Sequence, residues 1–328
     1  MPLIVRCDNG IVTDRYLEII GESLKNRYDN VHYTNNINDA LKENRNEVIV
    51  VARTIDAFKL VISGFKRVIV WFQGIEPEES FMVHNSKVRY HILTVMERII
   101  LKKAVFFIFV SQEMKKHYEA KYRIRIKSSK CYCMPCLNTN IRQETFRDEE
   151  KYRNNYFAYV GSMAVWQKFD EIVKAFKKVE EAQIPNSKLF VYTAEKEKAI
   201  SILVQHNVIN FEIGFVKNEE LPKVLKKIKY GFIIREDTVV NRVATPTKIS
   251  TYMSCGLIPV FSTCLRDFAT VAINLRYVVP YDENFISKLE EFNAIDMKQI
   301  YEEYKDVFDT YYNSDLHRSK LSRKWRVL

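Results

Sequence analysis

The segment TPTKISTYMSCGLIPVF, residues 245–261, combines features that could bind an anion. Pro246 suits the first turn of a helix, where its missing N–H would have no partner in any case, and the amides that follow it point out of the helix start. A helix start attracts anions, Lys248 adds a full positive charge, and the Thr247 hydroxyl adds a donor. Arg235 lies shortly upstream and could converge on the same ligand. This combination suits a diphosphate.

A plainer interpretation of the same residues is that Pro-Thr only starts a helix and that Lys248 extends into solvent. Gly256 would end this helix, and an apolar strand follows directly. The residues alone leave both interpretations open.

Glycine positions are informative because the chain contains only 8 glycines. Gly74 and Gly161 each directly follow an expected strand, at a point where a backbone can approach a ligand closely. The sequence contains neither G-x-G-x-x-G nor G-x-x-x-x-G-K-[ST]. The fingerprints of dinucleotide-binding dehydrogenases and of P-loop enzymes are therefore missing.

Short apolar runs alternate with amphipathic helical stretches through nearly the whole chain, which is the pattern of parallel α/β sheets. The expected strands are 3–6, 31–34, 48–52, 68–72, 105–110, 130–134, 156–160, 188–192, 211–214, 231–235, 258–262 and 277–280. Each half of the chain thus carries six strands with helices between them. The predicted fold class is α/β, with two Rossmann-like, doubly wound parallel-sheet domains.

The domain boundaries follow from a change in composition. The polar segment 142–155 is the expected linker between a first domain, 1–150, and a second, 151–311. A final helix at about 312–328 is expected to pack back onto the first domain. Two doubly wound domains place ligands at the carboxyl ends of their strands, in a cleft between the domains.

Composition and charge limit the function classes. The charged content of 28% is ordinary for a globular protein, whereas the net charge of +10 and the pI near 9.1 favour anionic partners. The first residues, MPLIVRCDNG, lack the apolar length of a signal peptide, and the apolar runs are too short to span a membrane. We therefore expect a cytoplasmic protein, either soluble or peripheral at the inner face of a membrane.

Two further groups of residues have competing interpretations. The basic stretches 87–103 and 115–130 suit anionic lipids or RNA, although a solvated face is the ordinary role of such runs. Cys131, Cys133 and Cys136 are close enough to share an ion, but no fourth Cys or His lies nearby. A structural role is predicted for these cysteines, with no metal.

Five longer motifs resemble a known family. YVGSMAVWQKFDEIVKAF, followed further along by VATPTKISTYMSCGLIPV, resembles the donor-binding half of GT-B glycosyltransferases of the large retaining family 4 type, especially bacterial polysaccharide enzymes. The first half of the chain resembles them more loosely, through WFQGIEPEES, FVSQEMKKHY and MPCLN. The resemblance implies transfer of a sugar, with retention, from a UDP- or GDP-sugar to a saccharide or lipid-linked saccharide in surface polysaccharide synthesis. It implies no metal, no cofactor and no nucleic-acid partner.

The resemblance also implies roles for individual residues. Gly161 and Ser162 would approach the donor phosphates and Lys168 would neutralise them, with Lys248 and Thr247 near the phosphates or the ribose. The donor-side set also includes Trp166, Arg235 and Thr251; the acceptor-side set comprises Gln73, Gly74, Glu76 and Asn9; and Lys168, Lys248 and Gln73 are the catalytic candidates. Cations at these positions would stabilise the negative charge that builds on the departing diphosphate.

The sequence departs from the family pattern at three positions. Ser162 stands where many relatives have Arg, Thr251 where a Glu usually holds the ribose hydroxyls, and Val243 where a partner Glu is common. These departures keep open a catalytically inactive protein of the same fold. A nucleotide-sugar epimerase or hydrolase and a basic nucleic-acid-binding protein are further alternatives.

The acidic residues Glu76, Glu78 and Glu79 are not assigned as a hydrolase pair. They are expected in a solvated loop, from which Glu76 could contact acceptor hydroxyls.

Overall fold

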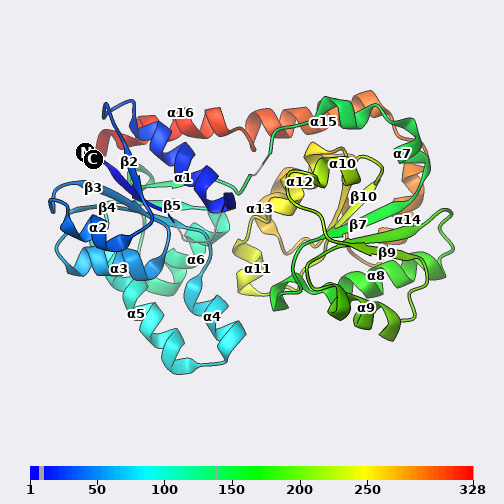
Figure 1. Cartoon of the computed structure of the whole chain (residues 1–328), viewed down its shortest axis with the longest axis horizontal. Helices are drawn as coiled ribbons and strands as arrows, with labels where there is room; N and C mark the ends of the chain where they lie inside the picture. The colour runs from blue at the N-terminus through cyan, green and yellow to red at the C-terminus, as the bar shows by residue number, and fades with distance from the viewer. Residues whose placement is uncertain (7–10, 138, 328) are drawn as a thin grey trace. The chain divides into compact units, whose positions relative to one another are not determined.

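The computed structural model describes all residues except 7–10, 138 and 328 (Figure 1). The chain forms two compact units. Unit 1 comprises Met1–Asn138, Val243–Thr245 and Asn313–Leu328, and unit 2 comprises Thr139–Arg242 and Pro246–Tyr312.

Unit 1 is built on a six-stranded parallel sheet with the order β2-β1-β3-β4-β5-β6. Its strands are β1 (Leu3–Val5), β2 (His32–Thr34), β3 (Val48–Val51), β4 (Arg67–Phe72), β5 (Phe106–Phe109) and β6 (Cys131–Cys133). The central strands β3 and β5 are buried at every position, because helices cover both faces of the sheet.

Helices connect the parallel strands of unit 1, and one more helix joins this unit from the far end of the chain. They are α1 (Ile11–Leu24), α2 (Ile37–Lys42), α3 (Thr54–Ile62), α4 (Glu76–His84), α5 (Lys87–Lys103), α6 (Gln112–Tyr122) and α16 (Ser314–Lys324), with short 3₁₀ turns at Ser128–Lys130 and Trp325–Val327. Helix α16 packs on α1, where the Trp325 indole N–H donates to the Ser23 hydroxyl at 2.9 Å.

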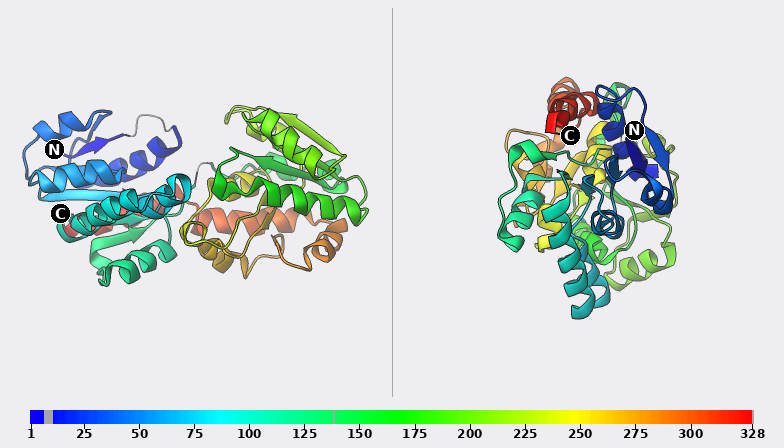
Figure 2. Two further views of the ribbon diagram at one scale, coloured as in Figure 1. Left: turned by 90° about the horizontal axis from the view of Figure 1, so that it is seen from below. Right: turned by 90° about the vertical axis from the view of Figure 1, so that its left-hand side faces the viewer.

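Unit 2 contains a second six-stranded parallel sheet, with the order β12-β11-β10-β7-β8-β9. Its strands are β7 (Tyr156–Val160), β8 (Lys188–Tyr192), β9 (Phe211–Gly214), β10 (Tyr230–Ile233), β11 (Ile258–Phe261) and β12 (Val279–Pro280). The longer helices of this half are α7 (Glu149–Arg153), α8 (Phe169–Glu181), α9 (Lys196–Gln205), α10 (Leu221–Leu225), α11 (Val239–Val243), α12 (Thr247–Ser254), α13 (Arg266–Ala272), α14 (Phe285–Glu290) and α15 (Met297–Thr310). Figure 2 shows the sheet of unit 2 with helices on both of its faces.

All twelve expected strands are confirmed; three have the expected ends, and the ends of the others differ by at most two residues. The predicted fold class is confirmed as well, since both sheets are wholly parallel and flanked by helices. The differences in strand ends arise where a run continues past the ladder, as at Arg235, which follows β10 and begins a loop.

The segment 142–155 differs from the expected linker. It contains a 3₁₀ turn at Gln143–Phe146 and helix α7, and both Phe146 and Tyr152 are buried. Lys151 is buried too, and its ammonium group donates to the carbonyls of Thr145 and Cys255. The polar composition of the segment does not predict this packing, because only a few side chains of the segment face the core of unit 2.

Within the described part of the chain, no helix is both long enough and apolar enough to cross a membrane.

Candidate functional site

The carboxyl end of β7 and the start of α12 form a cationic site in unit 2. Gly161 follows β7 with φ +142°, and a Cβ atom there would lie 2.7 Å from Nζ and 2.8 Å from Cε of Lys248. The Lys248 side chain therefore lies over the strand end, at a position that only a glycine leaves open. Its ammonium group donates to Gln167 Oε1 at 2.5 Å and lies 4.3 Å from the ring centre of Tyr159. The alternative in which Lys248 extends into solvent is wrong.

Arg235 is the second cation of this site and is only 9% exposed. Its guanidinium Nη1 donates to the Trp166 carbonyl at 2.6 Å, which places Trp166 beside the site through its backbone. Burial lowers the pKa of Arg235 to about 10. Burial, together with the nearby Arg235 charge, holds the pKa of Lys248 well below its usual range.

These two cations lack a carboxylate partner in the part of the chain that the structure describes. No ion pair among the described residues involves Lys248 or Arg235. Two like charges held together in a partly dry site disfavour each other, and a bound anion would remove this penalty. The geometry therefore fits a phosphate group between β7 and α12.

Lys168 has a different environment. It precedes α8 in the left-handed conformation, with φ 48°, and its ammonium group forms an ion pair with Glu236 Oε2 at 2.6 Å. The two side chains are 32% and 53% exposed, so water also reaches the pair. Sequence reasoning missed Glu236, although it directly follows Arg235. The charge of Lys168 is already matched, in contrast to that of Lys248.

Two buried tyrosines fix the loop that carries Gly161 and Ser162. The Tyr159 hydroxyl donates to the Ser162 carbonyl at 2.5 Å, and the Val160 amide donates to the Tyr252 hydroxyl at 3.0 Å. Neither tyrosine was singled out from the sequence, because their roles depend on contacts between distant segments. The loop is thus held in place by contacts from two distant segments.

Helix α12 begins at Thr247, one residue later than predicted, with Pro246 as its N-cap. The Thr251 hydroxyl donates to the Thr247 carbonyl at 3.0 Å, a bond within the helix that a Glu side chain would not make. The Val243 carbonyl accepts a hydrogen bond from the Ser111 hydroxyl at 2.6 Å within unit 1. As predicted, Gly256 follows the helix in the left-handed conformation, with φ +71°.

The acceptor-side residues predicted in unit 1 lie at the carboxyl end of β4. Gln73 is exposed, and its side-chain oxygen accepts from the Thr13 hydroxyl at 3.5 Å. A Cβ atom on Gly74 would overlap Glu79 Oε1, so the Glu79 carboxylate covers the open face of this glycine. Asn9, the remaining residue of this set, lies outside the described residues.

The expected solvated loop at Glu76, Glu78 and Glu79 is wrong, because these residues form the first turn of α4. Glu76 Oε1 accepts from the Thr54 amide at the start of α3, at 2.9 Å. Glu79 Oε1 accepts from the Ile75 amide at 3.1 Å. Carboxylates are favourable at a helix N-terminus, and Pro77 is tolerated in the first turn. Glu79 thus holds the start of α4, and Glu76 ties it to the start of α3.

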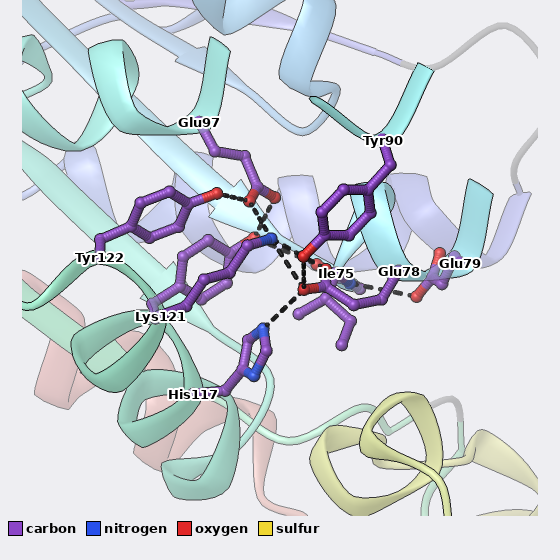
Figure 3. Close-up of polar contacts among 10 residues, drawn as sticks. Ile75, Glu78, Glu79, Tyr90, Glu97, His117, Lys121 and Tyr122 are labelled. Carbon is purple, nitrogen blue, oxygen red and sulfur yellow. Dashed lines mark hydrogen bonds and ion pairs between the residues drawn. The ribbon is translucent and has the colours of Figure 1, made fainter. Parts of the chain in front are cut away.

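Glu78 belongs to a largely buried polar network that joins α4, α5 and α6 (Figure 3). It forms an ion pair with Lys121 at 2.8 Å, and Lys121 also contacts Glu97 at 3.2 Å. Glu97 is fully buried and accepts further hydrogen bonds from the hydroxyls of Tyr118, at 2.8 Å, and Tyr122. Burial raises the pKa of Glu97, and these donors oppose the increase.

The basic stretch 115–130 is less available than its composition predicts. Lys115 pairs with Glu119 at 3.0 Å, Lys116 pairs with Glu113 at 2.6 Å, and Lys121 is part of the buried network.

The thiols of Cys131 and Cys133 contact backbone carbonyls. Among the residues that the structure describes, no group of three or more His, Cys, Asp or Glu side chains is arranged to hold a metal ion.

Comparisons with known proteins add evidence on the fold. Neither a protein-family model nor a curated protein sequence matches the chain. Solved structures do match, and one is WaaG, a glycosyltransferase involved in lipopolysaccharide biosynthesis, at 12% identity and a TM-score of 0.63, over 98% of this chain and 99% of that one. A second is the E. coli trehalose-6-phosphate structure bound with UDP-2-fluoro glucose, at 10% identity and a TM-score of 0.66, over 98% and 99%. The chain has the GT-B fold.

A larger protein shares this GT-B fold. A mutant of S. aureus TarM, in complex with Fondaparinux, alpha-GlcNAc-glycerol and UDP, matches at 9% identity and a TM-score of 0.61. The match covers 88% of this chain but only 56% of TarM. At such identities the likeness establishes the GT-B fold alone.

Proposed function

We propose that the chain is a glycosyltransferase that binds a nucleotide-sugar donor through unit 2. The observation that carries this proposal is the pair of unmatched cations, Lys248 and Arg235, at the carboxyl end of β7 beside Gly161. The carboxyl ends of parallel strands are where α/β sheets bind ligands, and the donor's diphosphate is the anion that this site fits. The GT-B fold, shared with sugar transferases, favours this anion over a free phosphate.

The reaction breaks the bond between the anomeric carbon of the sugar and the departing diphosphate oxygen. A new bond forms between that carbon and an acceptor hydroxyl oxygen, and the hydroxyl proton passes to the departing diphosphate. Negative charge grows on the diphosphate in the transition state, so Lys248 and Arg235 stabilise the transition state more than the bound donor. In our proposal the sugar is transferred with retention and without a metal ion.

A UDP-sugar is the first donor to test, because two of the three structures named above contain UDP or a UDP-sugar analogue. A GDP-sugar is the second. The acceptor in this proposal is a saccharide or lipid-linked saccharide, contacted by Gln73, Gly74 and Glu76 of unit 1, in the synthesis of a surface polysaccharide.

Thermal-shift measurements with UDP, GDP, CDP and dTDP and their common sugar conjugates test the donor site. A ligand that binds only the native chain raises its melting temperature by mass action, so one nucleotide series should stabilise the chain. That shift should disappear in Lys248→Ala and persist in Lys223→Ala, which removes an exposed lysine of α10. If none of the nucleotides shifts the melting temperature, the donor proposal is overturned.

A further inference from the structure

Helix α5 exposes an apolar stripe that nothing in the described part of unit 1 covers. Val88, Ile92 and Val95 lie three or four residues apart, on one face of the helix, and are 72%, 56% and 57% exposed. The opposite face is buried through Met96, Glu97 and Ile100. Solvated apolar side chains in a row along one helix are unusual, because an ordinary surface helix places its polar residues there.

The neighbouring helix α4 also exposes apolar side chains. Phe81 and Val83 are 37% and 52% exposed, and α4 packs against α5 in the hairpin at the edge of unit 1 (Figures 1 and 2). A row of exposed apolar side chains such as the one on α5 commonly marks an interaction surface.

The exposed charge of α5 is entirely positive. The exposed cations of the helix are Lys87, Arg89, Arg98, Lys102 and Lys103. The one acid of α5, Glu97, is fully buried and bound to Lys121 and two tyrosines. No ion pair in the described ranges occupies any of these five cations. Their charges are therefore available to an anionic partner.

We propose that the α4–α5 hairpin docks on an anionic lipid surface, with Val88, Ile92 and Val95 in the acyl boundary and the flanking cations at the head groups. An interfacial helix combines such an apolar face with Lys and Arg. A second copy of this chain is the less suitable occupant, because packing two such faces together would bring the five cations of each copy close to one another. This docking does not depend on the proposed function. Only the idea that docking brings the chain to a lipid-linked acceptor rests on that function.

Co-sedimentation of the full chain with lipid vesicles tests this docking. The chain should bind mixed phosphatidylcholine–phosphatidylglycerol vesicles more tightly than pure phosphatidylcholine vesicles, and added salt should weaken the binding. Arg98→Gln/Lys102→Gln should lower the partition coefficient by about 30-fold, since each cation near an anionic surface contributes about 1 kcal/mol. Ile92→Glu/Val95→Glu should abolish binding.

Matched variants in unit 2 serve as controls. Ile209→Glu/Ile273→Glu changes two side chains that are 84% and 78% exposed, and Lys217→Gln/Lys223→Gln removes two exposed cations. Both should bind vesicles as the original chain does. The proposal is overturned if anionic vesicles do not bind the chain, or if the α5 variants bind them unchanged. It is also overturned if light scattering detects self-association that Ile92→Glu/Val95→Glu abolishes, without vesicle binding.

The outcome is independent of the donor site. A UDP-induced thermal shift, measured on the same α5 variants, should equal that of the original chain, because α5 belongs to unit 1 and the cationic site to unit 2. If the original chain shows the nucleotide shift but does not bind vesicles, the docking surface alone is overturned. If it binds vesicles but shows no nucleotide shift, the donor proposal alone is overturned.

Discussion

At the scale of single residues, the two candidate catalytic lysines differ in what already neutralises them. Lys168 is paired with Glu236, whereas Lys248 faces Arg235 and has no carboxylate partner among the described residues. A diphosphate gains more binding free energy from a cation without a carboxylate partner than from a cation whose ion pair must first be broken. We therefore expect Lys248 to be the more important of the two for the proposed reaction.

This difference predicts unequal losses of activity. Lys248→Ala should lower kcat/KM by about 10²–10³-fold, the usual effect of removing one group that stabilises transition-state charge. Lys168→Ala should cost about tenfold or less, in line with an exposed ion pair. Steady-state kinetics with the donor identified by thermal shift measure both. An equal or larger loss in Lys168→Ala would reverse the assignment.

Gly161 offers a sharper test of the same site. Gly161→Ala would place a methyl group 2.7 Å from Lys248 Nζ at φ +142°, so the lysine must move and the strand end must distort. The nucleotide-induced thermal shift should be lost.

Gly64→Ala is the matched control, because Gly64 also has a positive φ, +87°, but a Cβ atom there would contact nothing within 4 Å. It should cost about 1 kcal/mol of stability or somewhat more, and should leave the nucleotide shift intact. If the two variants behave alike, backbone strain rather than the position of Lys248 explains the loss.

At the scale of elements, the sequence predicts the features that depend on residues close together in the chain. The strands were predicted because each is a short apolar run between polar segments, and Gly256 because a helix end needs a left-handed residue. The Lys168–Glu236 pair and the Glu97 network join residues far apart in the chain, so no window of the sequence contains them. Lys121 was interpreted as one cation of a surface run, although its two carboxylate partners lie on other helices.

Helix α7 affects the stability of the chain in a way that its sequence does not predict. Burial lowers the pKa of Lys151 from 10.5 to about 7, and its ammonium group donates to two backbone carbonyls. Between these two values the unfolded chain binds a proton that the folded chain does not, so the free energy of unfolding increases as the pH rises from about 7 to 10.5. Below pH 7 both states carry the proton, and this contribution is constant.

Lys151→Met should remove this pH dependence. Urea unfolding at several pH values should give a stability difference between variant and original chain that is largest near pH 7 and shrinks toward about pH 10. Lys196→Met, which changes an exposed lysine of α9, should keep the original profile. A constant difference across this range would mean that Lys151 keeps an ordinary pKa in the folded chain.

At the scale of the whole molecule, the order of the chain does not follow the order of the units. Unit 1 is completed by Asn313–Leu328, after unit 2 has been traversed. Trp325 is 1% exposed, packs edge-on against Phe106 of β5 at 4.9 Å and donates to Ser23 of α1. The segment that ends the chain thus contributes to the core of unit 1.

Trp325→Ala should therefore destabilise unit 1 and leave unit 2 unchanged. Removing a buried tryptophan typically costs about 3–5 kcal/mol, and native-state hydrogen exchange should show this as faster exchange in β5 at Phe106–Phe109, with β7 at Tyr156–Val160 as the internal reference. Ser23→Ala removes the hydrogen bond but keeps the packing, and should cost about 1–3 kcal/mol, because the indole N–H is left buried without its partner. Equal acceleration in β5 and β7 would mean that the two units unfold together, and no acceleration would mean that unit 1 is stable without the tryptophan.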